Sequence, residues 1–249
     1  MKSYIYIYMQ IIRGDDYQSW VYAHHDDLIV VDPWLTNKQV FPGLNWLLHR
    51  SALRESYLVK HNLINKVTHI IITAHFSDHL DLESLNKFDK DIQIYTTHEA
   101  SKVLIKNGFQ NVTIVKINQS YDLGSLRLQI YQAGKPYHTT TFAYCLDDGN
   151  ARVFHESHMF NKNLDIEDVD ACILTVDKVK VFGIVQASMD IEQAKSAQLA
   201  LNSKYFIPTG IAPTRTKGLI SYILSIKEFY SETDLLPTVC REVGDTLSI

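Results

Sequence analysis

The sequence lacks the cysteine patterns of disulfide-stapled and zinc-thiolate proteins. Its three cysteines, Cys145, Cys172 and Cys240, are odd in number and widely spaced, and no C-x-x-C pair occurs. A disulfide framework and a thiolate zinc site are therefore excluded. We expect the three thiols to be buried and reduced, as in a cytosolic protein.

Long apolar runs are also missing. No stretch approaches the roughly 18 apolar residues that cross a bilayer. Residues 1–12 alternate around Tyr4, Tyr6 and Tyr8, which is typical of a strand and not of a signal peptide. We therefore expect a cytoplasmic protein with no membrane partner.

Charge of one sign is not concentrated anywhere in the chain. The formal net charge is −4, and lysines and arginines are interspersed with acidic residues. We therefore expect no nucleic-acid partner. With 46% hydrophobic and 21% charged residues among 249, the composition is ordinary for a globular protein. No linker or low-complexity stretch interrupts it, so we predict a single domain over residues 1–249, which could form an oligomer.

Local patterns predict a mixed fold of strands and helices. Strands are expected at residues 4–12, 19–23, 28–31, 68–73, 92–95, 112–117, 126–132, 141–146, 152–154, 171–176 and 205–207. Helices are expected at residues 52–61, 82–87, 98–107, 191–202 and 219–230, and an irregular loop at 34–46. The run Thr68–Thr73 (THIIIT) is typical of a strand buried on both faces. Early strands lead into strand–helix alternation and this half-pattern then recurs, which favours packed α and β layers.

Residue types that bind metals follow the buried strand directly. His75, Asp78, His79 and Asp81 lie between this strand and the next predicted helix. Loops at the carboxyl ends of strands are where rigid scaffolds place functional groups, and imidazole with carboxylate suits Zn²⁺, Mn²⁺ or Fe²⁺. Two interpretations stay open at this point. The segment is a metal site, or Asp78 and His79 merely pair while Asp81 or Ser77 caps the helix.

This segment resembles the signature of the metallo-β-lactamase superfamily, T-H-x-H-x-D-H followed by L-D. The matching positions are Thr73, Asp78, His79, Leu80 and Asp81. Ala74 and Phe76 stand where the first two histidines are usual. His75 falls between them, at a position whose side chain we expect to point elsewhere.

Other segments resemble the same superfamily in the same order along the chain. They are Val31–Leu35 (VDPWL), Phe41–Gly43 with Trp46, Arg152–Phe160 (RVFHESHMF), Ser188–Ala194, Tyr205–Gly210 and Gly244–Asp245. Residues 156–158 are similar to the E-P-H of a bacterial and plant subgroup that keeps the Asp-His pair. Ser188 and Gly210 stand where the superfamily has further histidines. The resemblance implies an α+β fold, the four-layer αβ/βα sandwich of the metallo-β-lactamase fold.

The resemblance also implies a depleted metal site. The superfamily holds two metals, which lower the pKa of a bridging water. Asp78 and His79, usually ligands of the second metal, are retained. We expect Glu156 and His158, which share one face if their segment is extended, to complete a site for one divalent ion, Zn²⁺ or Mn²⁺, with His138 as a further ligand. The alternatives are a polar helix entrance for the pair and a loop histidine for His138.

Supporting roles are expected for the neighbouring residues. Asp78 would orient the water or act as the base. Asp32 is expected to support the loop through hydrogen bonds. His155 would point to the opposite face of its strand, and Asp81 is expected to cap the following helix in preference to binding metal.

Three functions remain open from the sequence. The first is a metal-dependent hydrolase of a small-molecule ester, lactone or phosphodiester, acting through metal-activated water. The second is a catalytically inactive protein of the same fold that binds a small ligand, since Phe76 would make the cleft apolar. The third is oxidoreduction at a single iron, for which histidines are scarce.

Overall fold

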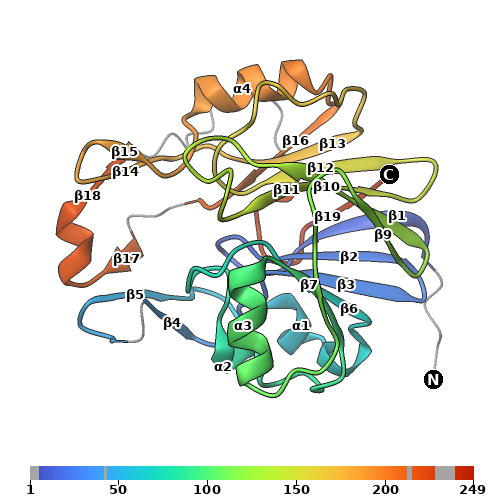
Figure 1. Cartoon of the computed structure of the whole chain (residues 1–249), viewed down its shortest axis with the longest axis horizontal. Coiled ribbons are helices and arrows are strands. Elements are labelled where there is room, and N and C mark those ends of the chain that lie inside the picture. The colour runs from blue at the N-terminus through green and yellow to red at the C-terminus, as the bar shows by residue number, and fades with distance from the viewer. Residues whose placement is uncertain (1–5, 42–43, 212–214, 228–238) are drawn as a thin grey trace.

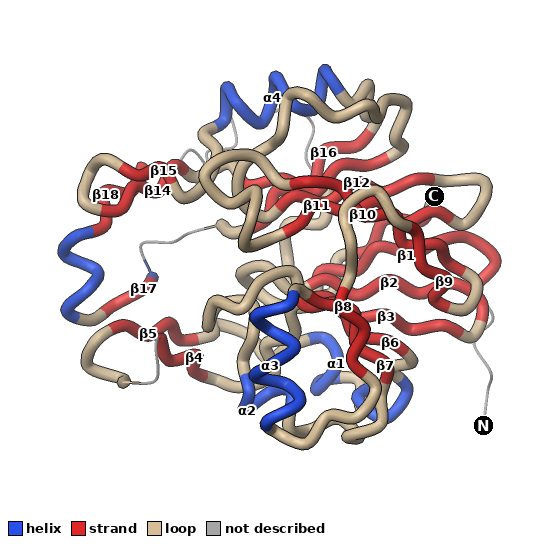
Figure 2. The backbone as a smooth tube through the Cα atoms, in the orientation of Figure 1, coloured by secondary structure: helices blue, strands red, loops and turns tan. Residues whose placement is uncertain are grey.

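Two β-sheets pack face to face in this protein, with helices on the outer side of each sheet (Figure 1; Figure 2). The computed structural model describes residues 6–41, 44–211, 215–227 and 239–249. The arrangement is the four-layer αβ/βα sandwich that the sequence predicts. Within the described ranges, none of the helices has both the length and the apolar character needed to span a bilayer.

The first sheet contains seven described strands in the order β19-β1-β2-β3-β6-β7-β8. They are β1 (Tyr6–Arg13), β2 (Trp20–His25), β3 (Asp27–Val31), β6 (His69–Ile72), β7 (Gln93–Thr96), β8 (Val112–Ile114) and β19 (Thr246–Ser248). Strands β1 to β3 are antiparallel, whereas β3, β6, β7 and β8 run parallel. Parallel neighbours require crossover connections, so the helical segments of this half fall between them.

The second sheet contains six described strands in the order β16-β13-β12-β11-β10-β9. They are β9 (Ser120–Leu123), β10 (Leu126–Gln132), β11 (Phe142–Asp147), β12 (Arg152–Glu156), β13 (Ala171–Thr175) and β16 (Tyr205–Thr209). Strands β12, β13 and β16 are parallel. Strands β11 and β12 form a hairpin whose connection contains Asp148-Gly149, with Gly149 at φ +90°.

Helices cover the two outer faces of the sandwich (Figure 1). They are α1 (Tyr57–Lys60), α2 (Leu82–Leu85), α3 (His98–Lys106) and α4 (Ile191–Ala200), with the 3₁₀ helix η1 (Ile64–Lys66). A further 3₁₀ helix, η3 (Leu219–Ile223), lies away from both faces, at one side of the sandwich. The predicted cap of α2 is confirmed, because the Asp81 side chain accepts a hydrogen bond from the Ser84 N–H. Helix α4 begins with a capping box between Asp190 and Gln193.

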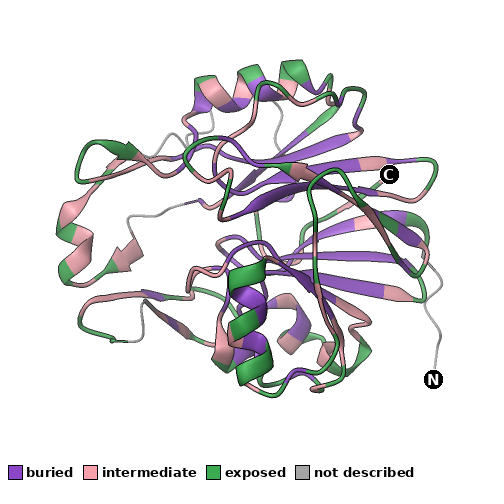
Figure 3. Ribbon diagram, viewed as in Figure 1, coloured by how far each residue is buried: buried purple, intermediate pink, exposed green. Residues whose placement is uncertain are grey.

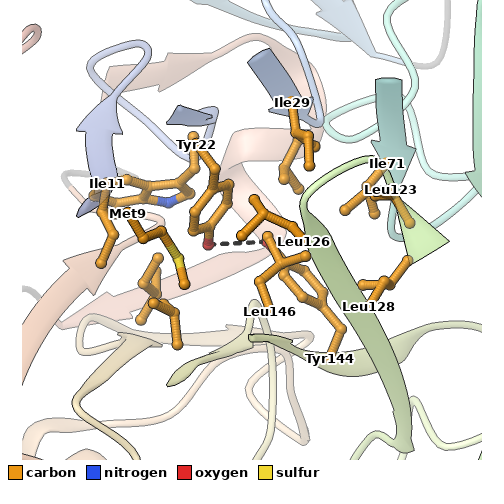
Figure 4. Close-up of a cluster of buried hydrophobic side chains, with 14 of the residues drawn as sticks. Met9, Ile11, Tyr22, Ile29, Ile71, Leu123, Leu126, Leu128, Tyr144 and Leu146 are labelled. Atoms are coloured by element: carbon orange, nitrogen blue, oxygen red, sulfur yellow. Dashed lines mark hydrogen bonds between the residues drawn. The ribbon is translucent and has the colours of Figure 1, made fainter. Parts of the chain in front are cut away.

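Three apolar clusters hold the four layers together. One lies between the two sheets, one between the first sheet and α1 to α3, and one between the second sheet and α4. The buried strands stand out in Figure 3. Figure 4 shows the middle cluster, where Tyr22 and Tyr144 meet among aliphatic side chains from both sheets with their hydroxyls 3.2 Å apart. The expected burial of the cysteines is confirmed, and burial raises the pKa of each thiol to about 12.

Two small sheets project from one side of the sandwich and were not predicted (Figure 1). One consists of β14 (Lys178–Val181), β15 (Val185–Gln186) and β18 (Leu224–Lys227), and the other of β4 (Lys38–Phe41), β5 (Leu48–Ser51) and β17 (Thr216–Lys217). The predicted loop at 34–46 therefore contains a strand. The predicted closing helix at 219–230 is wrong in its described part, which is a 3₁₀ turn followed by β18. Residues 228–230 lie outside the described ranges.

Candidate functional site

The candidate site lies where parallel strands of both sheets end. Asp32 follows β3, and the loop from Thr73 to Asp81 follows β6, its parallel neighbour. In the second sheet, β12, β13 and β16 end at Glu156, Thr175 and Thr209. Carboxyl ends of parallel strands meet at one edge of a sheet, and this edge is where both halves present polar side chains.

A buried hydrogen-bond network fixes His79 at this edge. Its Nδ1 lies 2.7 Å from Asp32 Oδ2 and 2.9 Å from Thr73 Oγ1. Asp32 also accepts hydrogen bonds from the Thr73 N–H at 2.8 Å and hydroxyl at 2.5 Å. All three side chains are buried. The expectation that Asp32 supports the loop through hydrogen bonds is confirmed, and the bond at Nδ1 leaves Nε2 of His79 buried without a hydrogen-bond partner among the described residues.

Two carboxylates control the charge of His79. Burial by itself lowers the pKa of this imidazole, but Asp78 and Asp32 outweigh burial and raise the pKa to about 9. Nε2 lies 3.7 Å from Asp78 Oδ2. The ring is therefore an imidazolium near neutral pH in the metal-free protein.

Glu156 and His158 reach the site through a bend and not through an extended segment. Strand β12 ends at Glu156, residues 157–158 bend, and the His158 N–H donates to Glu156 Oε1 at 2.9 Å. The premise that the two side chains share a strand face is therefore wrong, yet both are buried at the site edge. Burial raises the pKa of Glu156 to about 8, whereas burial and the nearby charge of His79 hold the pKa of His158 well below its usual range.

Aromatic side chains surround His158. Its ring centre lies 4.8 Å from that of His79, 4.3 Å from that of Tyr137 and 6.1 Å from that of Phe76, with which it is stacked. Phe76 thus lies beside both histidines. Tyr137 was not predicted from the sequence, where its one signal is its position next to His138.

A cavity of about 570 Å³ opens in front of these residues. Its wall includes Asp78, His158, Phe76 and Tyr137, together with residues of the two small sheets. The expectation that His75 points elsewhere is not met, because His75 is also part of this wall. A cavity of this size suits a small organic molecule.

The other expected residues lie outside this cavity. His138 lines a separate cavity with Lys135 and Asn161. His155 points away from the site as expected and accepts or donates a hydrogen bond at Tyr144 Oη, 2.7 Å from its Nδ1. Asp81 caps α2. The structure therefore brings together Asp78, His79, Glu156 and His158, but not His138.

The remaining superfamily positions offer no imidazole. Ala74 is buried in an isolated bridge with Thr141. The Ser188 hydroxyl donates to Asp177 O at 2.6 Å. Gly210 has φ +59°, and an added Cβ would lie 3.1 Å from Thr175 Cγ2. A two-metal site therefore does not fit this chain.

The residues that remain fit one metal ion by their chemistry. Across the described ranges, no group of three His, Cys, Asp or Glu side chains is arranged to hold a metal ion. In the same ranges, His79 Nε2, Glu156 Oε2 and His158 Nδ1 are buried without a hydrogen-bond partner, which is costly unless a ligand compensates. Two imidazole nitrogens and a carboxylate suit a zinc-type or manganese-type ion, and Asp78 stands beside them.

The sequence matches the family described as beta-lactamase superfamily domain over residues 15–210. The chain belongs to this superfamily, and its fold is that of the metallo-β-lactamases. No curated protein sequence matches the chain.

Solved structures with the same fold include several metal-dependent proteins. One, from Veillonella parvula and described as a possible metal-dependent hydrolase, is 14% identical with a TM-score of 0.65, covering 97% of this chain and 99% of that one. An isothiocyanate hydrolase from Delia radicum gut bacteria is 14% identical with a TM-score of 0.64, covering 81% and 84%. The diiron β-hydroxylase CmlA from Streptomyces venezuelae is 14% identical with a TM-score of 0.63, covering 94% of this chain and 49% of CmlA. This chain thus spans about half the length of CmlA. At these identities the likeness shows the fold alone.

Proposed function

We propose that the protein is a hydrolase that uses one divalent metal, Zn²⁺ or Mn²⁺, held by Asp78, His79, Glu156 and His158. The observation that carries this proposal is the set of buried, unpartnered donor atoms on His79, Glu156 and His158 beside the cavity, within the described part of the chain. When bound, the ion would supply a water of lowered pKa and polarise the substrate's carbonyl or phosphoryl oxygen.

The residues around these donors have separable tasks. Asp32 orients His79 through Nδ1, which directs Nε2 at the site. Asp78 is part of the cavity wall, so its carboxylate can orient a water and take its proton. Gln18 and Gln39 both donate to the Asp78 carbonyl oxygen, at 2.5 and 3.3 Å, which holds the loop in place.

Metal binding at this site is coupled to the loss of a proton from Glu156. Its raised pKa means that a large share of the free protein carries a proton on this carboxyl near neutral pH. A cation there would favour the carboxylate, so cation binding would release the proton. Affinity for a metal should therefore increase with pH.

The test is metal content, measured by mass spectrometry after expression with zinc or manganese. We expect close to one ion per chain in the wild type and loss of most of it in the double variant Asp78→Ala with His79→Ala. His98→Ala, which removes an exposed histidine at the start of α3, is the matched control and should keep the ion. Absence of metal from the wild type under both supplements, or its retention in the double variant, would overturn the proposal.

A second candidate is a catalytically inactive protein that binds a small ligand. The stacking of Phe76 on His158 favours it, because an aromatic ring occupies the position of a metal-binding histidine in the superfamily motif. This candidate predicts ligand binding in the cavity without metal and without turnover. A metal-free wild type that still binds neutral aromatic molecules would support it over the hydrolase.

A further inference from the structure

The wall of the large cavity is apolar where the small sheets form it. Val179 and Val181 lie two residues apart on β14 and share one face. Leu224 of β18 pairs with Val181 across the ladder and so joins the same face. Leu48 of β5 and Phe76 add to this part of the wall.

The lysines of the same strand lie on the opposite face. Lys178 and Lys180 alternate with the two valines, and strand alternation points them away from the cavity. Lys178 instead forms an ion pair with Asp190 at 2.8 Å. Both lysines are half-buried, and neither is part of the cavity wall.

No lysine or arginine of residues 6–41, 44–211, 215–227 or 239–249 lines the cavity. The stretches outside these ranges contain one cationic residue, Lys2. Arg50 lies behind the wall residue Tyr17, with its guanidinium carbon 4.1 Å from the ring centre, and donates to the Ile211 carbonyl at 3.0 Å. Among the described residues, Asp78 is the one carboxylate in the wall.

The charges around His79 do not change this balance. Its side chain is fully buried behind the wall, and the carboxylates of Asp32 and Asp78 lie 2.7 and 3.7 Å from its nitrogens. With the proposed divalent ion bound, the carboxylates of Asp32, Asp78 and Glu156 carry three negative charges against its two positive charges. An anionic substrate group would have to lose its water without gaining a side-chain cation.

From this wall we infer that the substrate of the proposed hydrolase is a neutral, largely apolar ester or lactone whose non-reacting part packs against Val179, Val181 and Leu224, and not a phosphodiester or another anion. The inference rests on the proposed function for the reaction and on the wall residues for the substrate class.

Two fluorescent dyes that share one scaffold provide a direct test. N-phenyl-1-naphthylamine is neutral, and 8-anilino-1-naphthalenesulfonate adds a single sulfonate to it. We expect the neutral dye to bind the wild type at least about tenfold more tightly, because the sulfonate would be desolvated without a counter-charge. Equal or tighter binding of the sulfonate would overturn the inference, and this comparison needs no variant.

Two lysine variants show where the dyes bind. Val181→Lys puts a cation in the wall. It should weaken binding of the neutral dye and reduce the tenfold difference in affinity between the two dyes. Ile184→Lys puts the same charge on an 82% exposed position of the neighbouring β14–β15 turn and should change neither affinity. Loss of dye binding in Ile184→Lys but not in Val181→Lys would place binding on the outer surface and overturn the inference.

Hydrolysis separates the two proposals. Cleavage of 1-naphthyl acetate that requires the metal and is lost in Val181→Lys, with bis(4-nitrophenyl) phosphate left intact, would support both. Preference for the neutral dye without ester cleavage would support the cavity assignment and count against the hydrolase. Faster cleavage of the phosphodiester would overturn the inference and leave the hydrolase standing.

Discussion

Replacing Asp32 with asparagine should destabilise the metal-free protein by about 3 kcal/mol near neutral pH. Asp32 is buried and lies 2.7 Å from His79 Nδ1, and removing one partner of a buried charged pair costs about 3–5 kcal/mol. The pKa of His79 leads to a similar figure. Its rise from 6.5 to about 9 corresponds to roughly 3 kcal/mol at about 1.4 kcal/mol per unit, a contribution that Asp32 shares with Asp78.

The sign of the pH dependence follows from the same shift. The folded pKa of His79 lies above its unfolded value, so this contribution is fully present below about pH 6.5. It is lost as pH rises through about 9. The Asp32→Asn variant should lose less stability than the wild type over this interval. Glu156, whose pKa burial raises to about 8, titrates in both proteins, so its effect largely cancels in the difference between them.

The assay is urea denaturation followed by tryptophan fluorescence between pH 6 and 9.5, with a chelator present. Thr73→Val is the matched control. It removes the hydroxyl that donates to Asp32 but no charge, so it should cost about 1 kcal/mol and keep the wild-type pH dependence. If Asp32→Asn cost under 1 kcal/mol at pH 7, or followed the wild-type curve in parallel, the assignment of His79 as a buried imidazolium would be refuted.

The remaining predictions concern the core, a helix cap and the thiols. Leu128→Ala, at a fully buried position between the sheets, should lower the free energy of unfolding by about 2–5 kcal/mol in chemical denaturation. Leu199→Ala, at an 81% exposed position on α4, should change it by no more than about 0.5 kcal/mol. Equal losses in the two variants would contradict the core assignment. Asp190→Ala removes the capping box of α4 and should cost about 0.5–2 kcal/mol, with Asp190→Asn recovering most of it; no recovery would assign the loss to the ion pair with Lys178. The three buried cysteines, with their raised pKa values, should resist Ellman's reagent at pH 8 until denaturant is added, and rapid reaction of any thiol in buffer would contradict their burial.

The layered core could be predicted because its pattern is local. The run THIIIT reads as a strand buried on both faces, and the structure places Ile70 to Ile72 at the centre of the first sheet with no exposed surface. Helix α3 is bounded by Thr97, which caps it, and by Gly108 at φ +89°. In each case the pattern that predicts the element lies within a few neighbouring residues, so the local sequence is enough to predict it.

The small sheets could not be predicted, because they depend on contacts between distant segments. Strand β14 pairs with β18 about 45 residues later, and β5 pairs with β17 more than 160 residues later. Their strands are short and only half-buried, so they show no strong alternation. Residues 219–227 carry apolar residues at helical spacing, yet tertiary pairing makes the described part a 3₁₀ turn and a strand.

The site was predicted in part, for a related reason. Asp78, His79 and Asp32 belong to segments that follow adjacent parallel strands, so chain position predicts their meeting. His138 lies in the connection between β10 and β11, whose path the sequence does not determine, and the structure puts it on another cavity. The segment 156–158 is not fully extended, because residues 157–158 bend. Glu156 still reaches the site, because strand β12 ends at that edge.

The substitutions in the superfamily motif act together on one property of the cleft. Phe76 replaces an imidazole with an apolar ring, and Ala74 and Gly210 remove two more without adding polarity. Asp78 and His79, with Asp32 behind them, keep their buried network. A cleft altered in this way loses the positive charge of a second metal ion, and its wall becomes more apolar. A single-metal site and a neutral substrate are therefore linked expectations, since the same residues that exclude the second metal also remove the cationic field that an anion would need.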